Sequence, residues 1–310
     1  TVDRVDYSND TATASPKGKF SIPRSHLAGT GNNDYGYFGG GTTAPQPGTY
    51  TSIVDRLDYS NDTPTMTAKG PLSLVVYTLG ATGNASYGYF GGGSTGPSTT
   101  YTTTVSRIDY SSDTSTAAVK GPLANTRSYV SATGNASYGY FGGGSSPSKV
   151  STVDRVDYSS DTPTTSPKGP LSLARSHTGA TGNANYGYFG GGIKTGPARV
   201  STVDRIDYSN DTATAAAKGP LSGVTYAIAA TGDTSYGYFA GGHTPSLGYL
   251  SRIDRIDYSN DTPTATTKGP LNEVRRLLAA ASSQANSLGV APQSIWKDMT
   301  GKGHDTTVDG

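Results

Sequence analysis

The residues of this chain that could do chemistry recur in nearly identical copies, so we first ask which of them break the repetition. A catalytic site needs different groups in one place, and the acids outside the repeated motifs are few: Asp34, Asp233, Glu273, Asp298 and Asp305. Glycoside hydrolysis by paired carboxylates needs two acids about 5–10 Å apart, and the sequence indicates no unique pair. We therefore predict no catalytic residues, and a carbohydrate-active enzyme is kept as an alternative.

The residues that could bind metals or cofactors are equally scattered. His26 and His177 occupy equivalent positions of different repeats, and His243 and His304 lie elsewhere, so a shared zinc ion is not expected. The Asp-Tyr-Ser-Asn-Asp turns lack the spacing of a calcium loop, and the triple glycines lead into Ser, Thr and Pro instead of a phosphate-binding helix. The chain has no Cys. We predict no metal site and no cofactor.

The overall composition excludes two classes of partner. The formal net charge of the 310 residues is +1, which argues against nucleic acid held by bulk charge. No apolar run approaches the ~20 residues that span a bilayer, so we expect no membrane insertion.

The elements that carry these residues repeat about every fifty residues, which is the spacing of propeller blades. The motif Asp-Arg-x-Asp-Tyr-Ser, with Ser106 replacing the first Asp in one copy, occurs six times. Tyr-Gly-Tyr-Phe-Gly-Gly-Gly and its variants place Phe at 38, 90, 141, 189 and 239. In the fourth repeat we predict four strands, A to D, over 176–181, 186–191, 203–208 and 212–218. Gly219-Pro220 ends the last strand, because proline cannot donate to the ladder.

The fourth repeat resembles a kelch repeat. The similarity lies in Arg-Ser-His at 175–177, Tyr-Gly-Tyr-Phe-Gly-Gly at 186–191 and Asp-Tyr-Ser-Asn-Asp-Thr at 207–212, and it recurs over residues 1–271. The chain departs from kelch repeats in having Ala or Thr where a Trp follows the Thr. The nonapeptide Asp-Arg-Ile-Asp-Tyr-Ser-Asn-Asp-Thr is similar to repeats in structural proteins of marine bacteriophages, including cyanophages. That resemblance implies a virion component.

We therefore predict an all-β, kelch-like β-propeller of six four-stranded blades, five complete and one shared between the chain ends. Residues 1–271 form the propeller, and residues 272–310 form a C-terminal helix and tail that either closes the ring or docks to a neighbour. The helix prediction rests on Asn272 as N-cap and on an apolar face made by Leu271, Val274, Leu278 and Ala281. Degenerate A and B strands in this segment are the alternative.

Strand C carries an alternating row of charges, in which Val203, Arg205 and Asp207 share one face. We expect each Arg to meet an Asp on its own or the adjacent strand, which gives a ring of pairs that fixes blade register. The predicted structural ring consists of Arg4, Arg56, Arg107, Arg155, Arg205 and Arg255 with Asp6, Asp58, Asp109, Asp157, Asp207 and Asp257.

The B–C loops vary in length and the D–A loops vary in sequence, whereas the A–B and C–D turns are nearly constant. Since strands of a blade alternate in direction, the variable loops emerge on one face, which is typical of a scaffold with a recognition surface. The predicted contact residues on that face are Tyr50, Tyr77, Tyr101, Tyr129, His177, Tyr226, His243, Tyr249, Lys194 and Arg199. The alternative is that these are ordinary loop residues.

From these features we expect a non-enzymatic structural or adhesion module of a virion or another extracellular appendage. Its variable face would bind a glycan or a protein. The expected partners are other structural proteins of an assembly, a cell-surface glycan, and a further copy of the chain contacted through residues 272–310. A generic kelch protein-interaction adaptor is the other alternative.

Overall fold

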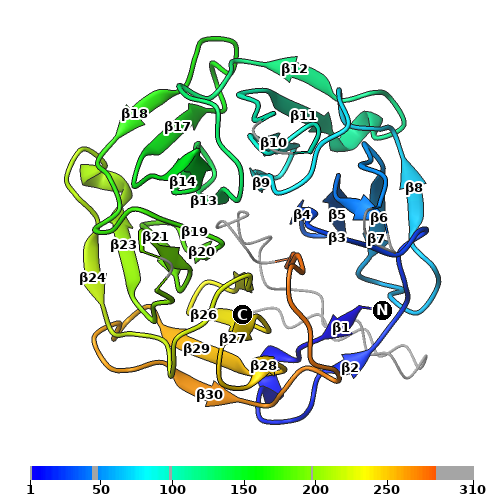
Figure 1. The fold of residues 1–310 in the computed structure, drawn as a ribbon. Helices are drawn as coiled ribbons and strands as arrows, with labels where there is room; N and C mark the ends of the chain where they lie inside the picture. Colours follow the sequence, from blue (N-terminus) through cyan, green and yellow to red (C-terminus); the bar gives the residue numbers. More distant parts are fainter. Residues whose placement is uncertain (1, 44–47, 98–99, 197, 284–310) are drawn as a thin grey trace, which may run out of the picture.

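The chain forms a wheel of small β-sheets around a central axis (Figure 1). The computed structural model describes residues 2–43, 48–97, 100–196 and 198–283. Five antiparallel four-stranded sheets, blades 1 to 5, follow one another along the sequence. Their A strands contact each other in order around the axis, and their D strands lie at the outside of the wheel. The predicted β-propeller is therefore confirmed.

The four strands of each blade run A to D in sequence order. In blade 1 they are β4 (Ala28–Gly31), β5 (Tyr35–Gly39), β7 (Val54–Asp58) and β8 (Thr67–Lys69). In blade 2 they are β9 (Gly80–Gly83), β10 (Tyr87–Gly91), β11 (Val105–Asp109) and β12 (Ala118–Lys120). In blade 3 they are β13 (Ser131–Gly134), β14 (Tyr138–Gly142), β17 (Val153–Asp157) and β18 (Ser166–Lys168). In blade 4 they are β20 (Gly179–Gly182), β21 (Tyr186–Gly190), β23 (Val203–Asp207) and β24 (Ala216–Lys218). In blade 5 they are β25 (Ala229–Gly232), β26 (Tyr236–Ala240), β29 (Ile253–Asp257) and β30 (Thr266–Lys268).

Short two-stranded sheets complete the wheel. β1 (Asp3–Arg4) pairs with β2 (Ser15–Pro16). Four further pairs lie on the B–C loop face. They are β3 (Arg24–Ser25) with β6 (Thr42–Thr43), β15 (Ser145–Ser146) with β16 (Ser148–Lys149), β19 (Arg175–Ser176) with β22 (Ile193–Lys194), and β27 (His243–Thr244) with β28 (Gly248–Tyr249). The helical turns of the described residues are three 3-10 turns, η1 (Tyr7–Asn9), η2 (Tyr110–Ser112) and η3 (Tyr208–Asn210). Among those residues no helix is long and apolar enough to cross a membrane.

Strand B forms the core of each blade because neighbouring blades cover both of its faces. In β14, Tyr140 and Phe141 are both fully buried, although they point to opposite faces. A Cβ atom added to Gly142 would lie 2.6 Å from the ring of Phe189 in the next blade. Glycine at this position therefore lets the aromatic ring of one blade press against the backbone of its neighbour.

The predicted ring of arginines is present, but the predicted partners are wrong. Each strand-C Arg reaches forward to the last Asp of the C–D turn in the next blade, as Arg56 does to Asp113 at 2.7 Å. The equivalent pairs are Arg107–Asp161, Arg155–Asp211, Arg205–Asp261, Arg255–Asp10 and Arg4–Asp62. These pairs join blade to blade all the way around the wheel.

The Asp residues that were predicted as partners build local turns instead. The Asp58 carboxylate accepts hydrogen bonds from the hydroxyl and the backbone N–H of Ser60. These bonds lower the pKa of Asp58. Asp6, Asp109, Asp157, Asp207 and Asp257 accept the same pair of bonds from the serine two residues later. The sequence pattern could not separate the two Asp positions, because both lie within a few residues of the Arg.

The blade count is five within the described residues, and the prediction of six four-stranded blades is wrong for them. Among the described residues, the place between blade 5 and blade 1 holds the two-stranded β1–β2 sheet and the chain from Leu271 to Ser283 (Figure 1). The predicted helix is also wrong over 272–283, which contains neither helix nor named strand. Residues 284–310 of the predicted tail lie outside the described residues.

The segment 275–282 is nevertheless built like a strand A. Arg275 pairs with Asp3 of β1 at 3.1 Å, just as Arg24 pairs with Asp55 at 3.1 Å in blade 1. The two ends of the described chain therefore meet in one place and close the wheel. The apolar residues that were predicted to form a helix face include Leu278, which packs against blade 5. The prediction failed because a short apolar run fits a strand as well as a helix.

Candidate functional site

A kink just before every strand A places one side chain at the end of the central axis on the B–C loop face. We call this end of the axis the mouth. The kinked residues have φ between 53° and 60°, in the left-handed region that non-glycine residues rarely adopt: His26, Thr78, Tyr129, His177, Ala227 and Leu277. Each donates its N–H to the carbonyl of the previous member, through Leu277 back to His26, at 2.7–3.4 Å. This closed ring of six hydrogen bonds fixes the mouth.

The kinked positions hold residues other than glycine, although glycine would relieve the backbone strain at positive φ. A residue held at positive φ costs of order 1–3 kcal/mol when it is not Gly, and the chain uses 42 Gly elsewhere. The six positions hold five different residue types, with His at two of them, while the flanking strand residues repeat. Non-glycine residues held in sparsely populated backbone conformations cluster at binding and active sites, so these side chains are candidates for binding.

Aromatic rings from the kinks, from the residues just before two of the kinks and from the B–C loops form a series around the mouth. We call it the aromatic belt, and its rings lie in the spatial order Tyr50, Tyr77, His26, Tyr129, His177, Tyr226, His243 and Tyr249. The Tyr50 and Tyr77 rings stack at 4.4 Å, and the Tyr129 and His177 rings stack at 3.6 Å. The remaining neighbours meet edge to face at 5.3–6.3 Å.

The short outer sheets position the belt. Tyr226 pairs with His243 across an isolated bridge, and His243 pairs with Tyr249 within the β27–β28 hairpin. Tyr77 is bridged to Ser94, which is itself bridged to Tyr101. The B–C loops of variable length therefore fold back onto the D–A segments. A small cavity of about 70 Å³ lies on the axis beneath the belt, between His26, Tyr129 and His177.

The histidines of the belt are held neutral. Burial, reinforced by the charge of Arg276, lowers the pKa of His26 to about 4. Burial also lowers the pKa of His177 to about 3, with contributions from His26, Lys149 and Arg276. Near pH 7 these rings therefore act as flat, uncharged surfaces with hydrogen-bonding nitrogens.

The charged groups beside the belt are cations. The guanidinium of Arg199 lies 5.3 Å from the centre of the Tyr226 ring, and that of Arg276 lies 4.9 Å from the centre of the Tyr249 ring. Both also lower the pKa of His243, after the effect of burial. The mouth therefore combines flat rings with positive charge.

Most of the predicted contact residues are brought together in the belt: Tyr50, Tyr77, Tyr129, His177, Tyr226, His243 and Tyr249, with Arg199 against it. Tyr101 lies next to them through its bridge to Ser94. Lys194 is exposed in β22, opposite Arg175, and no ring contact joins it to the belt.

Two residues at the mouth were missed as contacts: His26 in the belt and Arg276 beside it. His26 was noted only as the equivalent of His177, and that equivalence was the signal that could have found it. Arg276 was assigned to a helix, so its place beside Tyr249 could not be foreseen.

The acids that break the repeat lie away from the belt. Asp34 and Asp233 lie in A–B turns, at the opposite end of strand A, and Asp233 caps its turn by accepting from the N–H groups of Ser235 and Tyr236. Glu273 is exposed beside Arg275. Asp298 and Asp305 lie outside the described residues. Over the described ranges no three His, Asp or Glu side chains converge as metal ligands would.

Comparison with known proteins supports the fold. No family model matches the chain, and no curated protein matches it. A solved propeller titled "Structure of YjhT" superimposes with a TM-score of 0.66 at 12% sequence identity, covering 86% of this chain and 89% of that one. At this identity the likeness shows the fold alone.

Proposed function

We propose that the chain is a rigid, non-enzymatic structural or adhesion module that binds a glycan on its aromatic belt. The observation that carries the proposal is the retention of Tyr129 and His177 at positive φ, where they stack at 3.6 Å on the axis. Flat rings with few rotatable bonds offer contact area at low entropic cost and suit the apolar faces of sugars. The belt lies on the face with variable loops, which supports recognition over catalysis.

The kelch-like subtype and the setting of the protein belong to the same proposal. The motifs at 175–177, 186–191 and 207–212 support a kelch-like blade. The similarity of the nonapeptide Asp-Arg-Ile-Asp-Tyr-Ser-Asn-Asp-Thr to repeats in phage structural proteins supports a place in a virion or another extracellular assembly. There the wheel would display the belt, and other structural proteins of the assembly would hold its other surfaces.

A glycan array tests the binding proposal directly. We expect the full chain to retain a defined set of oligosaccharides without changing them, and to retain acidic ones better at low salt because Arg199 and Arg276 flank the belt. Tyr129→Gly relieves the strained φ while removing one ring of the stacked pair, so the fold should be kept and binding should fall about tenfold or more. Val119→Ser is the control, since Val119 is 64% exposed on the outer strand β12.

Three outcomes would decide against the proposal. Release of shortened sugars would favour the carbohydrate-active enzyme. Binding by Tyr129→Gly as strong as that of the natural chain would show that the belt is not the binding site. Retention of a protein partner, with no sugar retained, would favour the interaction adaptor.

A further inference from the structure

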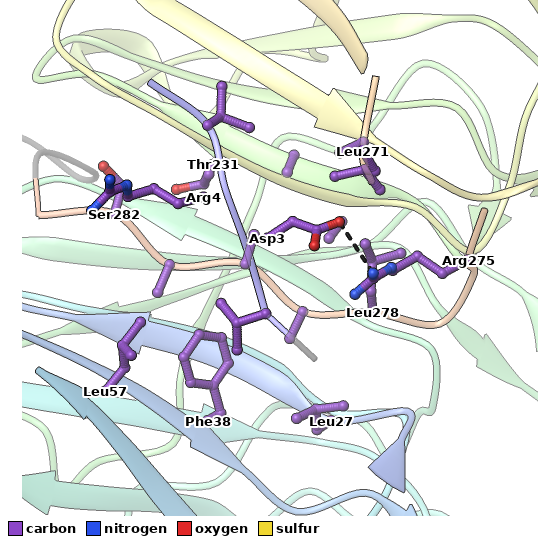
Figure 2. Close-up of a pocket in the computed structure, with 18 of the residues that line it drawn as sticks. Asp3, Arg4, Leu27, Phe38, Leu57, Thr231, Leu271, Arg275, Leu278 and Ser282 are labelled. Carbon is purple, nitrogen blue, oxygen red and sulfur yellow. Dashed lines mark ion pairs between the residues drawn. The ribbon is translucent and has the colours of Figure 1, made fainter. Parts of the chain in front are cut away.

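The gap between blade 5 and blade 1 contains a cavity of about 620 Å³ at the place where a complete blade holds strand B (Figure 2). Asp3 and Arg4 of β1 line the cavity, together with Leu278 and Ser282 from the end of the described chain. By their place in the repeat, these two segments correspond to strands C and A of a blade. In all five complete blades strand B lies between strands A and C. The contacts of those five strands therefore show what each wall of the cavity accepts.

The wall formed by blade 1 has a place for a Tyr side chain. In each complete blade the second Tyr of strand B donates its hydroxyl to the turn Asp of the next blade at 2.9–3.0 Å, as Tyr37 does to Asp113. Its ring stacks on the turn Tyr of that blade, with ring centres 4.6–5.0 Å apart. The equivalent turn residues at the cavity are Tyr59 and Asp62. Within the described residues, no ring stacks on Tyr59 and no Tyr hydroxyl reaches Asp62.

The arginine beside the cavity is also uncovered. In the five complete blades the first Tyr of strand B lies over the strand-C guanidinium at 4.2–4.3 Å. Those arginine side chains are 22–26% exposed, whereas Arg4 is 56% exposed. The walls of the cavity therefore fit two Tyr side chains that are separated by one residue.

One edge of β1 faces the cavity with its backbone. Val2 donates its N–H to Gly18, and its carbonyl accepts from Lys17, so both groups point toward β2. Since successive residues of a strand point their backbone groups to opposite edges, the N–H and carbonyl groups of Asp3 and Val5 point into the cavity. A strand edge of this kind is a template for a further strand.

Two other positions of such a strand require glycine. In blade 4, a Cβ atom added to Gly187, between the two Tyr residues, would lie 2.6 Å from the hydroxyl of the turn Tyr. A Cβ atom added to Gly190, at the end of the strand, would lie 2.6 Å from the ring of Phe239 in the next blade. The equivalent neighbours at the cavity are Tyr7 and Phe38, which both line it.

The position between the second Tyr and the last Gly requires a residue smaller than Phe. The Phe at this position packs against the last glycine of strand B in the previous blade, as Phe90 does against Gly39. Blade 5 has Ala240 in place of that glycine, and Ala240 lines the cavity, so a Phe in the cavity would meet its Cβ atom. All five Tyr-Gly-Tyr segments of this chain continue with Phe, and residues 284–310 contain no Tyr. The sequence that fits the cavity is therefore absent from these 310 residues.

We propose that the cavity receives an extended segment of a partner protein as the missing strand B. The segment has the sequence Tyr-Gly-Tyr, then a residue smaller than Phe, then Gly, and it pairs antiparallel with β1. Its first Tyr covers the guanidinium of Arg4, and its second Tyr stacks on Tyr59 and donates its hydroxyl to Asp62. Strand addition takes affinity from main-chain hydrogen bonds and specificity from the pockets for alternate side chains. None of these contacts involves the aromatic belt, so strand insertion and glycan binding are separate functions.

Titration calorimetry of the full chain with the peptide acetyl-Tyr-Gly-Tyr-Ala-Gly-amide tests the proposed surface. We expect saturable one-to-one binding, and failure to bind would overturn the proposal. Acetyl-Tyr-Tyr-Gly-Ala-Gly-amide is the control of equal composition, and it should not bind because adjacent side chains of a strand point to opposite faces. Asp62→Asn should weaken binding of the first peptide about tenfold, since the Tyr hydroxyl loses a charged acceptor.

An exchange of peptide preference tests the register. Acetyl-Tyr-Gly-Tyr-Phe-Gly-amide should bind the natural chain at least about tenfold more weakly than the peptide with Ala, because its Phe meets the Cβ atom of Ala240. Ala240→Gly removes that atom and should abolish the difference between the two peptides. Equal binding of both peptides by the natural chain, or a preference that Ala240→Gly leaves unchanged, would overturn the proposal.

Hydrogen exchange of the unmodified full chain identifies the occupant. The amides of Asp3 and Val5 should exchange rapidly in the free chain. With the peptide bound they should exchange as slowly as those of Asp55 and Leu57, which pair with strand B in blade 1. Slow exchange before any peptide is added would show that this chain covers the edge itself, and would overturn the proposal. If that slow exchange became faster on dilution, the edge would be covered by a second copy.

Discussion

At the residue scale, each blade is joined to the next through one carboxylate that collects three donors. Asp113 accepts from Arg56 at 2.7 Å and from the Tyr37 hydroxyl at 3.0 Å, and it pairs with Lys69 at 3.2 Å. Burial alone would raise the pKa of this carboxyl, but the hydrogen bonds from Lys69 and Tyr37 and the charge of Arg56 bring the pKa below its usual value. The carboxylate is therefore ionised, satisfied and shared between neighbouring blades.

Removing that carboxylate should be strongly destabilising. We expect Asp113→Asn to lower the free energy of unfolding by about 2–3 kcal/mol, because the buried Tyr37 hydroxyl and two cations lose their charged acceptor. Asp62→Asn is the matched comparison, since Asp62 accepts no Tyr hydroxyl from the described residues, and its effect should be smaller. Urea unfolding of both variants measures the difference, and an equal loss would contradict this account of the network.

The neutral histidines of the belt predict how stability depends on pH. The unfolded chain binds protons at these residues below about pH 6.5, whereas native His26 and His177 resist protonation until about pH 4 and 3. The unfolded state then holds more protons, so the free energy of unfolding falls as the pH falls from about 6.5 toward 4. We expect the Tm to drop by about 2–4 °C between pH 7 and pH 5.

Thermal scans of a His26→Asn/His177→Asn variant separate this effect from that of the carboxylates. Asn tolerates the left-handed conformation and does not titrate, so the variant should show a flatter Tm profile between pH 7 and 5. A profile as steep as that of the natural chain would contradict the assignment to these two histidines.

At the element scale, strand B sets the distance between blades. The glycine at its end lets the Phe of the next blade pack against the backbone, as Gly142 does for Phe189. The repeated Tyr-Gly-Tyr-Phe motif and the turn residues between the motifs were sufficient to predict this element and its neighbours. The predicted four strands of the fourth repeat are confirmed as β20, β21, β23 and β24. Strands A and D begin later than predicted, and strands B and C each end one residue earlier.

Substitution of that glycine tests the packing. Gly142→Ala should lower the free energy of unfolding by about 1–3 kcal/mol, since the new Cβ would lie 2.6 Å from a fully buried Phe189 that has no room to move. Ala240→Gly at the equivalent place in blade 5 should change it by less than about 1 kcal/mol. Chemical unfolding measures both, and a neutral Gly142→Ala would show that the blades are not packed as described.

The sequence could not predict the elements whose partners come from another blade. Arg56 has Asp58 two residues away and Asp113 in the next blade, and only the curvature of the wheel selects the second. Arg276 and Leu277 fit a helix pattern locally, but ring closure holds them as an irregular strand A. Most residues of the belt were predicted as contacts on one face. The order of their rings around the axis could not be predicted, because it depends on the kinks at positive φ.

At the scale of the whole molecule, the described chain is a closed wheel whose ends meet between blade 5 and blade 1. Arg255 and Tyr238 bind Asp10 near the N-terminus, and Arg4 binds Asp62 in blade 1. Arg255 and Tyr238 are each more than 200 positions from Asp10 in the sequence. A wheel closed in this way holds the six kinks in a fixed circle, and this rigidity is what allows eight rings from different blades to act as one surface.

Hydrogen-exchange mapping of the chain with an oligosaccharide retained from the array tests the central claim most directly. The account predicts slower exchange at the kinked residues of the mouth and in the β27–β28 hairpin, with no change in the A–B turns at the opposite end of the axis. Protection confined to those turns, with exchange at the mouth unaltered, would contradict it.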